Sequence, residues 1–141
     1  MTAALLMLMA HFRGRAGDRS PGHGLSRATI LLVEDEVLVR MSLAEQLRSA
    51  GYVVLEASNA DQALDLLQGH RVQVVLSDIQ MPGRLDGVKL AHAIRMRRPE
   101  IKIVLASAQS FSASHWSDYD GFFPKPYDAR RLIEHIKMLL G

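Results

Sequence analysis

Short apolar runs alternate with segments of helical spacing, and this alternation constrains the fold more than any other feature of the chain. The runs are residues 28–33, 53–57, 72–78, 101–106 and 121–124. Near-continuous apolar runs of this length are typical of strands that are covered on both faces. Strands joined through helices make right-handed crossovers and therefore run parallel. The pattern predicts an α/β fold: a doubly wound, five-stranded parallel sheet with helices on both faces.

Residues that commonly bound helices flank the predicted helical segments. Gly51 ends one helical segment, Asn59 and Gly69 bound the next, and Asp128 precedes the last; glycine often ends a helix, and Asn or Asp can cap its first turn. Pro124 has no amide hydrogen, so we expect residues 121–124 to form an edge strand or to end at Pro124. Residues 107–120 are poorly periodic, and we expect a short or irregular helix there.

Length and composition indicate one soluble domain. The chain has 141 residues, 48% of them hydrophobic and 23% charged, and it has no cysteine for a disulfide or a thiolate metal site. Residues 1–26 carry three arginines and one aspartate, a balance equal to the formal charge of the whole chain, +2. Residues 27–141 therefore carry no net charge, and we expect no nucleic-acid-binding face on the folded domain.

Residues 1–26 are predicted to be a disordered N-terminal leader that precedes a domain at residues 27–141. The apolar part of this leader, residues 3–10, is too short to span a bilayer. The arginines of the leader come after the apolar part, whereas in a signal peptide the basic region comes first. A weak amphipathic membrane anchor is the alternative, but we expect no membrane association.

Polar residues follow four of the five predicted strands. They are Glu34 and Asp35 after the first, Asp78 after the third, Ser107 after the fourth and Lys125 after the fifth. Because the carboxyl ends of parallel strands meet at one edge of a sheet, these side chains should lie close together. Each could instead be an ordinary helix cap or a solvated surface group.

Three carboxylates crowded at one edge repel one another unless a cation lies among them. With oxygen ligands only, Mg²⁺ is the cation that suits such a site. A divalent cation, an isolated carboxylate, a hydroxyl and an ammonium together match phosphoryl transfer onto Asp78. Lys125 would offset charge on the phosphoryl oxygens and Ser107 would donate to one of them.

These residues lie within five motifs of a known family. The motifs are Ile-Leu-Leu-Val-Glu-Asp-Glu at 30–36, Ser-Asp-Ile-Gln-Met-Pro-Gly at 77–83, Asp86-Gly87, Ala-Ser-Ala at 106–108 and Phe-Pro-Lys-Pro-Tyr at 123–127. In them the chain from about Arg27 to Gly141 resembles a response-regulator receiver domain, the CheY-like phosphoacceptor module of two-component signalling. Five motifs in the right order make the resemblance specific.

The resemblance implies a flavodoxin-like sheet in the order 2-1-3-4-5 and a role for each site residue. Asp78 would accept a phosphoryl group from a histidine kinase or a histidine phosphotransfer protein. Glu34, Asp35, Asp78 and the backbone carbonyl of Gln80 would hold Mg²⁺, and the Lys125-Pro126 bond would be cis.

A signal relay is also implied by the resemblance. In the family, a Ser or Thr after the fourth strand moves toward the phosphoryl group, and an aromatic residue on the fifth strand turns inward behind it. These positions correspond to Ser107 and Phe122, although core packing is the alternative explanation for Phe122.

Two departures from the family pattern stand out. Only fifteen positions separate Ser107 from Phe122, which indicates that about one turn of the fourth helix is missing. Because that helix belongs to the family's usual output face, the ordinary partner surface and dimer mode are in question. The second departure is the Glu34-Asp35 pair, where two aspartates are commonest.

We expect a stand-alone, cytoplasmic receiver, a monomer or weak homodimer, that acts on an unknown downstream protein or as a phosphate sink. It is not expected to be an enzyme beyond its own phosphorylation and dephosphorylation. A phosphatase of the haloacid-dehalogenase kind would need a second acid two residues after Asp78, where this chain has Gln80. A degenerate receiver that only binds would have lost a site residue, and none is lost.

Overall fold

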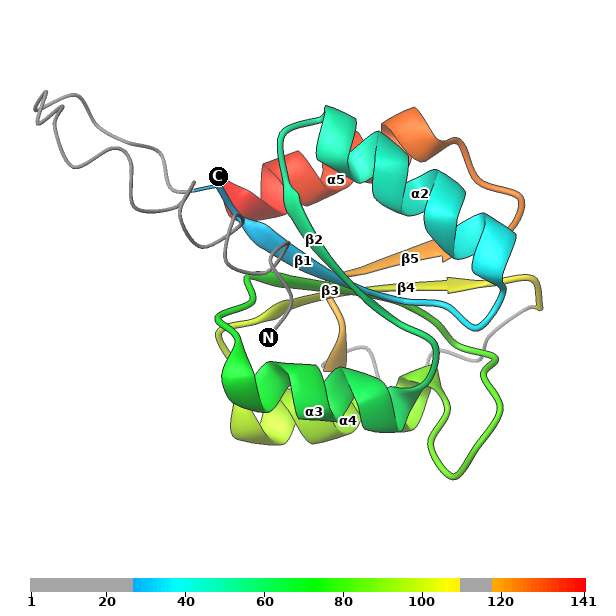
Figure 1. Cartoon of the computed structure of the whole chain (residues 1–141), viewed down its shortest axis with the longest axis vertical. Helices are drawn as coiled ribbons and strands as arrows, with labels where there is room; N and C mark the ends of the chain where they lie inside the picture. The colour runs from blue at the N-terminus through cyan, green and yellow to red at the C-terminus, as the bar shows by residue number, and fades with distance from the viewer. Residues whose placement is uncertain (1–26, 110–117) are drawn as a thin grey trace, which may run out of the picture.

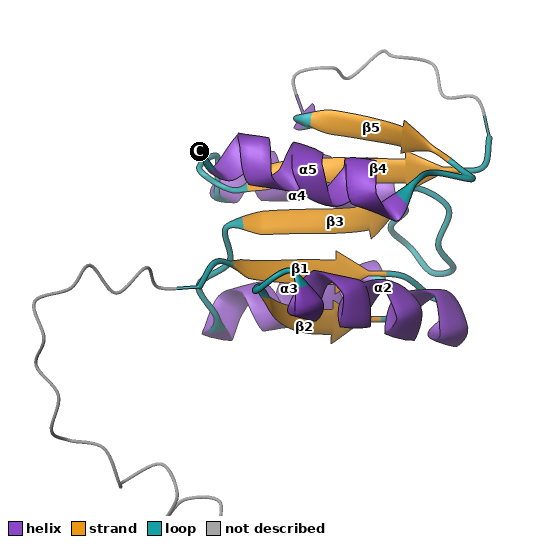
Figure 2. Ribbon diagram, turned by 90° about the horizontal axis from the view of Figure 1, so that it is seen from above, coloured by secondary structure: helices purple, strands orange, loops and turns teal. Residues whose placement is uncertain are grey.

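Five parallel strands form one sheet in the order β2-β1-β3-β4-β5, which confirms the predicted architecture. The computed structural model describes residues 27–109 and 118–141. In the described part the elements are β1 (Thr29–Val33), α2 (Val37–Ser49), β2 (Val53–Ala57), α3 (Ala60–Gly69), β3 (Val74–Asp78), α4 (Gly87–Arg97), β4 (Lys102–Ser107), β5 (Gly121–Pro124) and α5 (Ala129–Leu140). Figure 2 shows the strands side by side with their carboxyl ends at one edge.

Of the helices within the described residues, two cover each face of the sheet. Figure 1 shows α2 and α5 on one face and α3 and α4 on the other. Along β1, Ile30 and Leu32 pack toward the first pair of helices, whereas Leu31 and Val33 pack toward the second pair. Successive side chains of a strand point to opposite faces, so a central strand must be apolar at every position. This is why the predicted strands lack a polar alternation.

The helix boundaries follow the residues that the sequence singled out. Asn59 caps α3 by accepting from the Gln62 amide at 2.9 Å, and Asp128 caps α5 by accepting from the Arg130 amide at 2.9 Å. Pro124 ends β5, which lies at an edge of the sheet. β4 begins at Lys102, one residue later than predicted.

Two predictions fall outside the described residues. They are the leader at residues 1–26 and most of the irregular helix expected within 107–120, since residues 110–117 are not described. Among the helices that the structure does describe, none has the length and apolar character needed to cross a membrane.

The periodic apolar residues of α2 do not all face the core. Ala44 and Leu47 are fully buried, whereas Val37 and Met41 are 54% and 58% exposed, and Leu38 is 81% exposed. Figure 2 shows the first turns of α2 extending beyond the ends of β1 and β2, so their apolar side chains lack these strands to pack against.

Candidate functional site

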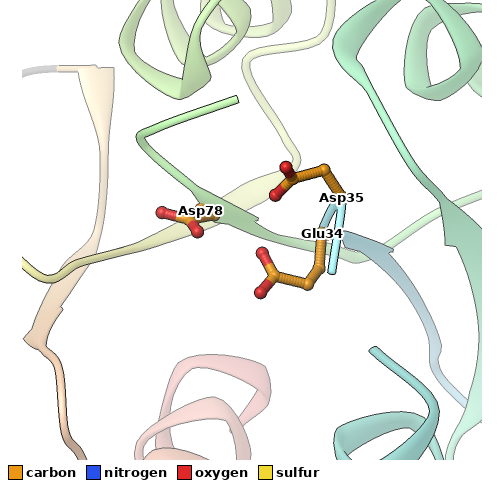
Figure 3. Close-up of side chains that lie close together, drawn as sticks. All are labelled: Glu34, Asp35 and Asp78. Atoms are coloured by element: carbon orange, nitrogen blue, oxygen red, sulfur yellow. The ribbon is translucent and has the colours of Figure 1, made fainter. Parts of the chain in front are cut away.

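The three carboxylates converge because their strands are neighbours. β1 pairs with β3 so that Val33 lies opposite Ser77, and Glu34 and Asp78 are the next residues along the two strands. Glu34, Asp35 and Asp78 each offer a carboxylate oxygen, and these atoms lie within 4.8 Å of one another. Figure 3 shows the three side chains gathered at the ends of the two strands. The predicted acidic cluster is therefore present in the fold.

Lys125 brings a positive charge to the same place from the end of β5. Its Nζ donates to Asp78 Oδ2 at 2.8 Å and lies 3.5 Å from Glu34 Oε1. Burial disfavours the charge on this ammonium, but the hydrogen bond to Asp78 and attraction to Asp78 and Glu34 outweigh burial and raise its pKa above the ordinary value. The Lys125-Pro126 bond is cis, as the resemblance implied.

Glu34 is the most buried of the three acids, with 4% of its surface exposed. Burial raises its pKa to about 7, and so do the hydrogen bond that a protonated Glu34 shares with Asp78 and repulsion from Asp78 and Asp35. Lys125 acts in the opposite direction but does not cancel these effects. When all three acids are ionised, the single charge of Lys125 leaves the cluster with a net negative charge.

The donor set fits a hard divalent cation. Glu34 Oε2 is buried and has no hydrogen-bond partner among the described residues, an arrangement that costs free energy unless a ligand approaches. All three side chains offer oxygen, and Asp35 is exposed, so one side of the cluster is open to water. These residues are suited to Mg²⁺ rather than to a softer metal.

Asp78 is placed to act as an acceptor. One oxygen, Oδ1, accepts from the Gln80 amide at 3.1 Å, and the other accepts from Lys125. Its side chain is 11% exposed, so it lies at the surface of the crevice but is largely shielded from water. The role of the Gln80 backbone carbonyl as a cation ligand stays a prediction.

Ser107 lies at the end of β4, beside the strand of Asp78. Its side chain is buried, and its hydroxyl oxygen accepts from the Gln109 amide at 3.1 Å, which leaves the hydroxyl hydrogen as a donor. The Ser107 carbonyl accepts from the Lys125 amide at 2.7 Å, which ties the two strand ends together. These contacts agree with a role at the site, but the role itself stays a prediction.

Phe122 lies on β5 opposite Leu105 and packs, partly buried, against the core on the α3 and α4 face. The contact is compatible with the inward position of a relay and equally with ordinary core packing. The switch role of Phe122 also stays a prediction.

The sequence reasoning missed one residue that touches the site. Arg40, on α2, donates from Nη1 to the backbone carbonyl of Glu34 at 2.7 Å. Its only sequence signal is its position six residues after Glu34, one turn inside the helix that follows the acids. Such a signal is weak, because an arginine there reads equally well as a surface charge.

Comparison with known proteins relates this arrangement to one family. The family model described as "Response regulator receiver domain" matches residues 30–137. The chain is 38% identical over 119 residues to the sensor kinase CckA of Brucella abortus, covering 80% of this chain and 12% of CckA. It is 34% identical over 116 residues to the transcriptional regulatory protein PdtaR of Mycobacterium tuberculosis, covering 79% of this chain and 56% of PdtaR. The chain thus spans less than two thirds of either relative.

Solved structures show the same fold. The response regulator TrrA of Thermotoga maritima, in complex with Mg²⁺-BeF, matches with a TM-score of 0.73 at 32% identity, covering 79% of this chain and 98% of TrrA. TrrA in complex with the histidine kinase ThkA matches with a TM-score of 0.73 at 33% identity, covering 81% of this chain and 99% of TrrA. With the family model spanning most of the described elements, the chain belongs to the response regulator receiver domain family.

Proposed function

We propose that this receiver domain is a phosphoacceptor of two-component signalling and that Asp78 receives the phosphoryl group. The observation that carries the proposal is the Asp78 carboxylate at the tip of β3, with Lys125 at 2.8 Å and two further acids within 4.8 Å. A structure of TrrA with Mg²⁺-BeF supports the assignment, because TrrA shares the fold at 32% identity.

In the proposed step a carboxylate oxygen of Asp78 bonds to phosphorus while the bond from phosphorus to the donor's histidine nitrogen breaks. The electron pair of that bond returns to the donor imidazole. Lys125 stays protonated, because its pKa is raised, and its charge offsets the negative charge of the phosphoryl oxygens. Ser107 is positioned to donate its hydroxyl hydrogen to one of those oxygens.

Glu34, Asp35, Asp78 and, as the resemblance implies, the Gln80 carbonyl would hold Mg²⁺. When bound, Mg²⁺ supplies Lewis-acid charge compensation at the phosphoryl oxygens. The protein residues contribute the placement: β1 and β3 set the spacing of the carboxylates, and the buried Glu34 Oε2 supplies a ligand atom without a competing partner.

The donor is proposed to be a histidine kinase or a histidine phosphotransfer protein. TrrA was solved in complex with the kinase ThkA, and this chain has an apolar surface next to its acceptor that could receive such a partner. A hollow of about 670 Å³ lies between the start of α2 and the loop from β5 to α5. Leu38, Val39, Lys125 and Tyr127 are among its lining residues. Leu38 is 81% exposed, and apolar side chains exposed together on a surface commonly mark a protein contact.

We propose further that the domain is a cytoplasmic signalling module rather than an enzyme that turns over a separate substrate. A phosphatase of the haloacid-dehalogenase kind is disfavoured because an exposed Gln80 takes the place of its second acid. Phosphorylation would shift an existing two-state equilibrium and so change affinity for a downstream protein.

Incubation with acetyl phosphate and MgCl₂, followed by intact mass measurement, tests the proposal. We expect one added phosphoryl group on the wild type, no addition without Mg²⁺, and none on Asp78→Asn. Beryllofluoride titration serves as a second readout if the phosphorylated form hydrolyses quickly. A folded wild type that neither gains mass nor responds to beryllofluoride would refute the phosphoacceptor role.

A further inference from the structure

Hydrogen bonds hold the backbone of Glu34, the residue that follows β1, on both its amide and its carbonyl side. The Glu34 amide donates to the Ala57 carbonyl of β2 at 3.0 Å, and the Glu34 carbonyl accepts from Arg40 of α2 at 2.7 Å. The first contact extends the sheet by one residue. The second comes from a side chain, and it fixes the carbonyl where the chain leaves the sheet and regular pairing ends.

Arg40 is itself anchored at the edge strand. Its Nε lies 3.4 Å from Glu56 Oε1 on β2, while Arg48 lies 3.1 Å from the other oxygen of Glu56 and donates to the Val54 carbonyl at 3.0 Å. The Arg40 side chain is 17% exposed, and that of Arg48 is 50% exposed. The two arginines therefore share one carboxylate, but only Arg40 reaches the site.

An exposed ion pair contributes little to stability. A hydrogen bond from a shielded guanidinium to a carbonyl is stronger and restrains the backbone more firmly. The planar fork of arginine lets one side chain contact both Glu34 and Glu56. The side chains of Glu34 and Asp35 leave the chain on either side of the peptide that Arg40 holds. Because this peptide joins Glu34 to Asp35, a rotation of it would change the positions of both carboxylates relative to Asp78.

We infer that Arg40 is a positioning residue for the cation site, acting through the Glu34 carbonyl. This inference rests on the proposed function, since it concerns the same cluster. Groups that orient the ligands of a metal commonly change its affinity by 10 to 100-fold when they are removed. Arg48 provides a matched control on the same helix, because it binds the same Glu56 and does not touch Glu34.

The test compares Arg40→Met, Arg40→Lys and Arg48→Met by calorimetric titration with MgCl₂ at pH 8. Arg40→Met should raise the Mg²⁺ Kd on the order of tenfold. Arg40→Lys, which keeps a donor and a charge, should recover part of the loss. Arg48→Met should change the Kd by no more than about twofold, because an exposed pair contributes little.

A second readout needs no metal. The Asp35 amide is joined to the carbonyl that Arg40 holds, so its nitrogen chemical shift should change in metal-free Arg40→Met and stay at the wild-type value in Arg48→Met. Glu56→Gln retains a side-chain oxygen that can accept from Arg40 Nε, so it should leave this shift and the Kd close to wild type.

Equal Kd values for Arg40→Met and Arg48→Met, with an unchanged Asp35 shift, would overturn the inference while leaving the proposed function intact. Absence of Mg²⁺ binding by the wild type would instead overturn the proposed cation site, and the inference with it.

Discussion

The α-carbon of Gly87 lies directly against the backbone carbonyl of Asp78. A Cβ at position 87 would overlap with the Asp78 carbonyl and with the Ile79 α-carbon. The Gly87 amide also donates to the Ile79 carbonyl at 2.8 Å. The first turn of α4 therefore contacts the backbone directly after β3, the strand that ends in Asp78. Glycine at this position therefore allows the loop after β3 to fold back onto the site.

Replacing Gly87 by alanine should displace the acceptor loop. We expect Gly87→Ala to lower the free energy of unfolding by about 1 to 3 kcal/mol, the usual cost of overpacking, and to slow phosphorylation by acetyl phosphate. Gly69→Ala is the control, because nothing lies within 4 Å of its Cβ position. Chemical denaturation and intact mass measure the two effects. Equal unfolding free energies for the two variants would contradict the packing argument.

Removing the ammonium of Lys125 should have opposite effects on Mg²⁺ affinity and on the rate of phosphorylation. The charge of Lys125 opposes a divalent cation among the acids, so Lys125→Met should bind Mg²⁺ several-fold more tightly at pH 8. It should also be phosphorylated more slowly, since nothing then compensates the phosphoryl oxygens on that side. Calorimetry and a phosphorylation time course measure these changes, with the exposed Lys89→Met as control. Weaker Mg²⁺ binding would show that Lys125 holds the cluster together instead.

The raised pKa of Glu34 predicts a pH dependence of stability in metal-free protein. Its folded pKa of about 7 exceeds the reference value of 4.5, so the native state binds more protons than the unfolded state between these values. The contribution of Glu34 is therefore fully present below pH 4.5 and is lost as pH rises to 7. Other groups titrate too, and the difference between wild type and Glu34→Gln isolates this one.

Thermal unfolding across this pH range measures the effect. The Tm of wild type should fall relative to that of Glu34→Gln as pH rises from 4.5 to 7, and adding Mg²⁺ at pH 8 should restore it, because a ligand of the native state stabilises it. Parallel Tm curves for the two proteins would show that Glu34 titrates normally.

Ser107 should be needed for the conformational response rather than for the fold. With its hydroxyl removed, Ser107→Ala should still fold but should lose most of the chemical-shift change at Phe122 on adding beryllofluoride. Ser107→Thr keeps the hydroxyl and should respond like wild type. An unaltered response in Ser107→Ala, together with normal phosphorylation, would rule out the relay.

Leu38 should be important for phosphotransfer from a protein donor but not for phosphorylation by a small-molecule donor. It is 81% exposed beside the groove, so Leu38→Ser should leave stability within about 0.5 kcal/mol of wild type, as surface changes usually do. We expect slower phosphotransfer from a histidine kinase and an unchanged rate from acetyl phosphate. Met138→Ser, on the exposed side of α5 and 66% exposed, is the control. A loss of rate with both donors would place the defect in the site instead of the groove.

Much of the fold could be predicted because its causes are local. The continuous apolar strands, the caps at Asn59 and Asp128 and the terminal Pro124 each act within a few residues of the chain. The convergence of Glu34, Asp35 and Asp78 could be predicted because the carboxyl ends of parallel strands meet at one edge of a sheet.

The remaining features depend on how distant elements pack. The exposure of Val37 and Met41 reflects how far α2 extends beyond β1 and β2, which periodicity alone does not reveal. The bond from Arg40 to Glu34 depends on the position of a helix relative to a strand end. The roles of Ser107, Phe122 and the Gln80 carbonyl are predictions still, since they concern a phosphorylated or cation-bound state.

The order of strands in the sheet has a consequence for biosynthesis. Glu34 is translated first and Asp78 after it, but Lys125 directly follows β5 and meets both acids only when that strand is docked on β4. A nascent chain with β1 and β3 already paired holds clustered acids without their counter-charge. The Lys125 charge that the proposed phosphoryl transfer uses is therefore in place only once β5 has joined the sheet.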